Sequence, residues 1–186
     1  MKATLHQAVS LALLSVAALS SGCKPPPSMI QFNNRIAEAN AKLYAVAGLY
    51  RKALITTGGA TNEFELATVK VEDLKAAYSK MDETLKEVQS LAEDMDLPRR
   101  STTATGMKEA FDKYLVEQKK VLDKANEITD VVAAGKRNGD NAGTKAKVIQ
   151  LLGTIKELET AAYADLEKAQ KGLADAHFLK LVSKLD

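Results

Sequence analysis

Residues 64–95 read FELATVKVEDLKAAYSKMDETLKEVQSLAEDM, and this stretch decides the fold. Its apolar side chains recur at alternating spacings of three and four residues, which places them on one face of a helix: Phe64, Ala67, Val71, Leu74, Tyr78, Met81, Leu85, Val88, Ala92 and Met95. Asn62, with Glu65 three residues later, is a candidate N-cap, and Pro98 ends the segment. The sequence predicts one helix over residues 62–96.

The same spacing predicts three further helices: one over residues 29–55, one that begins between residues 101 and 105 and ends near 133, and one over residues 144–184. Glycines separate the first two helices, and residues 134–143 are expected to form a long loop around Asn138-Gly139. No segment alternates with a period of two, so no strand is expected. The fold predicted for residues 29–186 is all-α: an elongated up-down-up-down four-helix bundle with coiled-coil-like packing.

The composition excludes several classes of protein. The chain has 26 basic and 24 acidic residues, a formal charge of +2, which is too balanced for a protein that neutralises nucleic-acid phosphates. A single cysteine excludes an intramolecular disulfide framework and cysteine-rich metal sites. Hydrophobic residues make up 46% of the chain and charged residues 27%, as in a folded domain.

The N-terminus carries the most specific signal in the sequence. After Lys2, an apolar run extends from Ala8 to Leu19. As a helix it would be roughly 18 Å long, too short to span a bilayer, so it is typical of a signal-peptide core. The residues that follow are Ser20-Ser21-Gly22-Cys23, which end on the only cysteine of the chain.

Residues 1–23 resemble a bacterial lipoprotein signal peptide with its lipobox. Ser21, Gly22 and Cys23 match the last three lipobox positions, whereas Ser20 stands where leucine is commonest. The resemblance implies removal of residues 1–22 and acylation of Cys23 at the start of a Pro-rich linker, residues 23–28. Because Lys24 and not Asp follows the cysteine, it also implies an outer-membrane location facing the periplasm. The alternative is an ordinary secretory signal followed by a free cysteine.

The expected topology brings the N-terminus, the connection near residue 100 and the C-terminus to one end of the bundle, which the lipid anchor would hold at the membrane. Candidate membrane contacts at this end combine basic and apolar side chains: Arg99, Arg100, Phe178, Lys180, Leu181 and Lys184. The alternative is that the C-terminal tail packs on the neighbouring helices. The opposite end would present the loops around Gly58-Gly59 and residues 134–143 to partners or only to solvent.

The sequence contains no nucleophile elbow, phosphate-binding glycine loop or HExxH motif, and without residues 1–22 only His177 remains as a histidine. We therefore expect no catalytic residue, no metal site and no cofactor. One alternative is haem binding, since periplasmic four-helix b-type cytochromes ligate haem through a Met of the first helix and a His of the last. Met29 and His177 occupy loosely analogous places.

These observations favour a non-enzymatic, lipid-anchored protein of the bacterial cell envelope with an interaction or structural role. Its expected contacts are the membrane, through acylated Cys23, and another envelope protein, with no nucleic acid. A periplasmic bundle that binds haem or another small ligand is the first alternative. An envelope protein with chaperone-like surfaces is the second.

Overall fold

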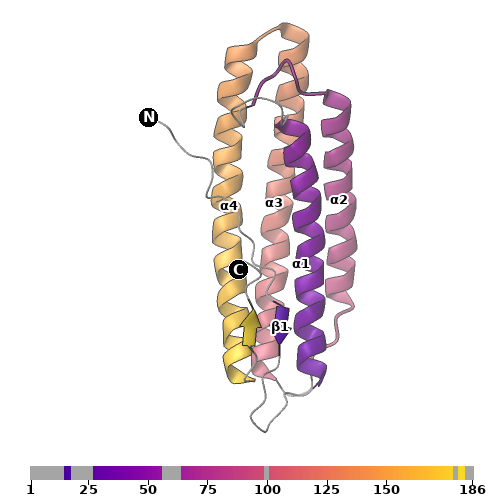
Figure 1. Ribbon diagram of the computed structural model, residues 1–186, viewed down its shortest axis with the longest axis vertical. Coiled ribbons are helices and arrows are strands. Elements are labelled where there is room, and N and C mark those ends of the chain that lie inside the picture. Colours follow the sequence, from indigo (N-terminus) through magenta and orange to yellow (C-terminus); the bar gives the residue numbers. More distant parts are fainter. Residues whose placement is uncertain (1–14, 18–26, 56–63, 99–100, 178–179, 183–186) are drawn as a thin grey trace.

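The computed structural model describes residues 15–17, 27–55, 64–98, 101–177 and 180–182. It contains the helices α1 (Pro27–Leu54), α2 (Val71–Glu93), α3 (Thr102–Asn138) and α4 (Asn141–Ala176). The helices run alternately up and down along the long axis, and α3 and α4 extend past α1 and α2 at the end away from the start of α1 (Figure 1). The predicted all-α four-helix bundle is confirmed.

The apolar stripes of the sequence form the core. In α1 every expected core position is buried: Phe32, Ile36, Ala39, Leu43, Val46, Tyr50 and Leu54. In α4 the stripe is buried at Leu151 and Leu166, but Ile155 and Leu158 between them are only half-buried. From Leu158 to Leu166 the stripe takes two steps of four residues, and Ala162 between them is buried.

The connection between α3 and α4 is much shorter than the predicted loop of residues 134–143. Helix α3 continues to Asn138, Gly139 caps it with φ of 71°, and α4 begins at Asn141. The Asp140 side chain accepts a hydrogen bond from Gly143 N at 2.9 Å and so caps α4. The turn signal at Asn138-Gly139 was placed correctly, but Gly135 was misread as a helix breaker.

Gly135 is needed for the close approach of the two helices. A Cβ atom at this position would collide with the Thr144 side chain, which is buried in the first turn of α4. The glycine therefore has a packing role inside α3, and its low helix propensity is offset by this contact. The predicted end of this helix near Ala133 was wrong for that reason.

The second helix also begins later than predicted. Residues 64–70 form an irregular segment whose apolar side chains Phe64, Leu66 and Val69 are buried. Thr68 Oγ1 donates to Glu65 O at 2.9 Å, which is the kind of local bond that competes with helix formation. Lys136 of α3 donates its Nζ to Ala67 O at 2.9 Å and holds the segment on the bundle. Asn62 lies outside the described residues.

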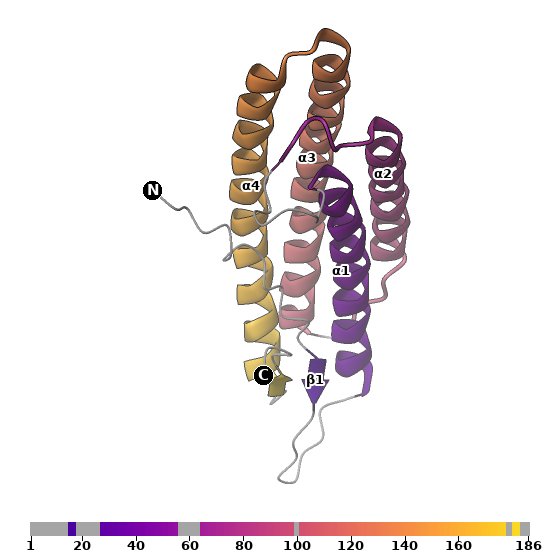
Figure 2. The same ribbon diagram turned by 45° about the horizontal axis from the view of Figure 1, so that its top comes forward.

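The last helix ends earlier than the predicted Lys184. His177 N donates to Ala174 O at 3.3 Å, a tight final turn that closes α4. Lys180–Val182 then form β2, which pairs antiparallel with β1 (Ser15–Ala17), so that Val16 lies opposite Leu181. The expectation of no strand was wrong for these two short segments. In both views β1 lies beside the start of α1 (Figures 1 and 2).

Replacing Gly135 tests the closest contact of the fold. We expect Gly135→Ala to lower the free energy of unfolding by about 1–3 kcal/mol, because the added methyl group overpacks the contact with Thr144. Gly153→Ala is the matched control, since a Cβ there meets no atom within 4 Å. The control should be more stable by up to about 1 kcal/mol through helix propensity. Urea unfolding measures both; equal stability of the two variants would contradict the contact.

Candidate functional site

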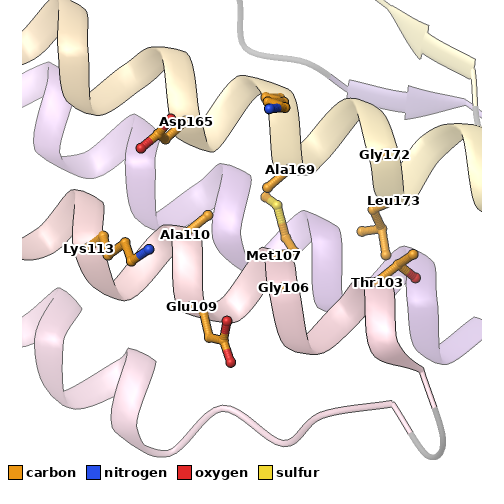
Figure 3. A pocket seen from close by; sticks show the side chains of 11 residues that line it. Thr103, Gly106, Met107, Glu109, Ala110, Lys113, Asp165, Ala169, Gly172 and Leu173 are labelled. Atoms are coloured by element: carbon orange, nitrogen blue, oxygen red, sulfur yellow. The ribbon is translucent and has the colours of Figure 1, made fainter.

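A groove lies between the first part of α3 and the last part of α4. It encloses about 410 Å³ and opens to solvent. Met107 and Leu173, each 1% exposed, form its floor. Residues with little or no side chain form its walls, as Figure 3 shows: Gly106, Ala110, Ala169 and Gly172.

The hollow exists because these side chains are small. A Cβ atom at Gly106 or Gly172 would meet no atom within 4 Å, so the packing of α3 on α4 does not require glycine at either position. Each glycine in a helix interior costs about 1 kcal/mol relative to alanine. Both are exposed. The groove is therefore a surface feature that internal packing does not explain.

Four charged residues stand on the rims of the groove: Glu109 and Lys113 on α3, and Asp165 and Lys168 on α4. All four are exposed, and among the described residues none of them makes an ion pair or hydrogen bond. Other charges do pair. Asp82 and Lys86 form a salt bridge at 2.5 Å, and Lys108 bonds Asp112 at 2.7 Å. The rim charges are therefore available to a partner.

Hydrogen bonds close the groove at the end where α3 begins. Ser101 Oγ caps α3 by accepting from Ala104 N at 3.1 Å, and it lies 2.9 Å from Thr103 Oγ1. Thr103 Oγ1 in turn lies 3.1 Å from His177 Nε2, at the end of α4. These bonds align the start of α3 with the end of α4. They also place one wall of the groove, Thr103, against the only histidine outside residues 1–22.

Buried polar contacts join α1 to α3 and α4 behind the groove. Gln170 Nε2 donates to Asn33 Oδ1 at 3.1 Å, and Tyr114 OH donates to Asn40 Oδ1 at 2.7 Å. Asn33 is fully buried, and its Nδ2 has no hydrogen-bond partner in the described part of the chain. The sequence reasoning missed both asparagines. Their spacing of seven residues, beside the apolar stripe of α1, is the signal that could have found them.

Tyr50 supplies a third polar contact further along α1. Its hydroxyl donates to Ala125 O at 2.6 Å and lies 3.1 Å from Thr129 Oγ1. Burial raises the pKa of the Tyr50 phenol, and also that of Tyr114. Both phenols therefore stay neutral at physiological pH and act as hydrogen-bond donors in the bundle interior.

Glu159 is a half-buried carboxylate in the part of α4 where the apolar stripe shifts. Burial raises its pKa above the ordinary value of 4.5, and the charge of Arg51 on α1 acts in the opposite direction. Its charge also acts on Tyr114 of α3. The folded state therefore favours protonation of Glu159 relative to the unfolded chain.

The predicted site residues are distributed unevenly over the structure. Cys23 and four candidate membrane contacts lie outside the described residues: Arg99, Arg100, Phe178 and Lys184. Lys180 and Leu181 lie in β2 and not on a continued α4, so the expected helical arrangement of that tail was wrong.

The two candidate haem ligands already have other roles in the fold. Met29 is buried at the start of α1, and His177 Nε2 lies within hydrogen-bond distance of Thr103 Oγ1. Haem ligation by His177 through Nε2 would have to break that hydrogen bond.

Two features are absent from the described residues. These residues contain no group of three or more histidine, cysteine, aspartate or glutamate side chains placed to hold a metal ion. Nor do they include a helix with the length and apolar character needed to cross a membrane.

The fold and the groove together define a four-helix bundle with an open surface, bordered by charges that have no ion-pair partner within the described part of the chain. Comparisons with protein-family profiles, curated proteins and solved structures find no match to this chain.

The protonation of Glu159 gives a testable pH dependence. Because the pKa of Glu159 is raised on folding, the free energy of unfolding should fall as the pH rises from about 4.5 through that raised pKa. Glu159→Gln removes this contribution. The variant should therefore gain stability relative to the wild type as the pH rises from 4 to 8.

Thermal unfolding across this pH range measures the effect. Glu157→Gln, at an exposed position of the same helix, is the matched control. A constant difference in stability between Glu159→Gln and the wild type would contradict the burial of the carboxylate.

Proposed function

We propose that this protein is a lipid-anchored component of the bacterial cell envelope that acts by binding another macromolecule. The anchor is proposed from the short apolar run and from Ser21-Gly22-Cys23, which resemble a lipoprotein signal. Acylation of Cys23 would attach the chain durably, because a lipoprotein cysteine carries three acyl chains, whereas a single chain gives only marginal membrane binding. The outer membrane, on its periplasmic side, is the proposed location.

The distance from the anchor to the fold supports a location of the groove near the membrane. Only Lys24-Pro25-Pro26 separate Cys23 from Pro27, the first residue of α1. Four residue steps span at most about 14 Å. The start of α1 lies at the same end as the start of α3 and the end of α4 (Figure 1). The groove occupies the first three turns of α3 from this end.

The groove with its four unpaired rim charges is the observation that carries the binding role. Exposed charges on the outer faces of helices commonly pair along the same helix, as Lys119 does with Asp123 at 3.3 Å. The four rim charges form no such ion pair within the described residues, and they border an open groove. A non-enzymatic role accords with the single remaining histidine, whose Nε2 lies within hydrogen-bond distance of Thr103 Oγ1.

Processing before Cys23 would also change the fold at this end. It would remove β1 with residues 1–22, and β2 would lose the strand it pairs with. The proposed mature protein therefore keeps the four helices, while residues 180–182 are released from the sheet. The membrane contacts proposed for Arg99, Arg100, Phe178, Lys180, Leu181 and Lys184 apply to this processed form.

Substituting Cys23 tests the anchor. We expect Cys23→Ser to move the protein from the membrane fraction to the soluble fraction and to abolish the mass of the acyl groups, because the thiol is the proposed acylation site. Ser20→Leu is the matched control, since it brings the lipobox closer to its commonest form and should remain membrane-bound. Fractionation and intact mass measure both. Membrane attachment of Cys23→Ser after a high-salt wash would contradict the proposal.

A further inference from the structure

The rim charges of the α3–α4 groove form a self-complementary pattern. On α3, Glu109 precedes Lys113, and on the antiparallel α4, Asp165 precedes Lys168. The contact of Thr103 with His177 fixes which residues of the two helices lie level. With a rise of about 1.5 Å per residue, Lys113 lies within one turn of the level of Asp165. Glu109 likewise lies within one turn of the level of Lys168.

We propose that this groove binds the same groove of a second copy of the chain, with the two bundles parallel. A two-fold axis along the groove exchanges its sides, so that α3 of one copy faces α4 of the other. Glu109 then faces Lys168 of the second copy, and Lys113 faces Asp165 of the second copy. All four rim charges, which are unpaired within the described residues of one copy, gain a partner of opposite sign.

The shape and chemistry of the surface fit a close contact between helices. The small residues at the walls allow the two backbones to approach, and a Cβ-sized space is open at Gly106 and at Gly172. Beyond the groove the same face continues with Val116 on α3, which is 58% exposed, and with Ala161 and Ala164 on α4. An apolar side chain that is more than half exposed next to a groove is suited to burial in an interface.

The proposed anchor selects between two arrangements. In an antiparallel pair, Glu109 would face Lys113 of the second copy, and Asp165 would face Lys168, so the signs would also match. That arrangement points the two N-termini in opposite directions, which two chains anchored in one membrane cannot adopt. The parallel direction therefore rests on the proposed lipid anchor, whereas the self-complementary groove does not.

Chemical cross-linking of the full chain tests the pairing directly. Isotope-labelled and unlabelled chains are mixed in equal amounts in a mild detergent, at about 1 mM, the effective concentration that a tether provides. A carbodiimide then joins facing carboxylate and ammonium groups, and mass spectrometry identifies links between labelled and unlabelled chains. We expect mixed links from residue 109 to 168 and from 113 to 165. Absence of mixed links at these four positions would overturn the proposal.

Two charge-swap variants with the same net charge distinguish the arrangements. Glu109→Lys with Lys168→Glu restores opposite signs in the parallel pair, so the mixed link from 109 to 168 should persist. Glu109→Lys with Lys113→Glu places like charges opposite each other in the parallel pair and should abolish the dimer. A mixed link from 109 to 113 in this second variant would show the antiparallel pair and overturn the parallel one. Circular dichroism of both variants verifies that the helices remain folded.

The intact mass of the same sample reports acylation of Cys23 independently. An acylated chain without mixed links would refute the dimer and leave the anchor in place. A chain without acyl groups that still gives the 109–168 link would refute the anchor and support the paired groove.

Discussion

The arrangement of the bundle depends on one close contact, in which α3 has no side chain at Gly135 and Thr144 of α4 occupies the space. With the cap at Asp140 and the left-handed Gly139, it joins two long helices through a two-residue turn. Antiparallel helices with such a short connection have a fixed register. That register carries through the hairpin to its other end, where Thr103 meets His177. The groove is built on this hairpin, so its charge pattern follows from the same contact.

Helix α1 is oriented on this hairpin by a few polar contacts within an otherwise apolar interface. An apolar stripe alone allows a helix to slide or rotate with little cost, whereas the hydrogen bonds that Tyr114 donates to Asn40 and Tyr50 donates to Ala125 require one register. The cost is visible at Asn33, which is fully buried and whose side-chain NH2 group has no hydrogen-bond partner in the described residues. A net hydrogen bond is worth about 1 kcal/mol, and an unpaired buried donor costs about 1–3 kcal/mol. These contacts therefore contribute more to specificity than to stability.

Helical periodicity was enough to predict the four helices and most of the buried side chains, because a stripe such as Phe32, Ile36 and Ala39 has only one favourable face to bury. Periodicity gave the wrong helix boundaries where local hydrogen bonds or tertiary contacts determine where a helix begins or ends. Thr68 bonds Glu65 and delays α2 to Val71, although Phe64 and Ala67 continue the helical spacing. In the sequence alone Gly135 is typical of a helix end, and its packing role is visible only in the structure, where Thr144 lies beside it.

The groove was not predicted, because exposed small residues such as Gly106 and Gly172 give no periodic signal. Their role becomes visible only when α3 and α4 lie side by side.

Exposed ion pairs are weak, so the proposed pairing through the groove would depend on the proposed anchor. Each such pair contributes a few tenths to about 1 kcal/mol, too little to hold two freely diffusing chains together at low concentration. The proposed lipid anchor would confine both copies to one surface, align them in parallel and provide an effective concentration in the millimolar range. An anchored rod that tilts about its linker would move least at its attached end. The groove residues lie on the first turns of α3 and the last turns of α4, which are at the same end as the start of α1 (Figure 1). In the proposed arrangement the anchor would supply proximity and direction, so that weak charge pairs across the groove would suffice to select the partner.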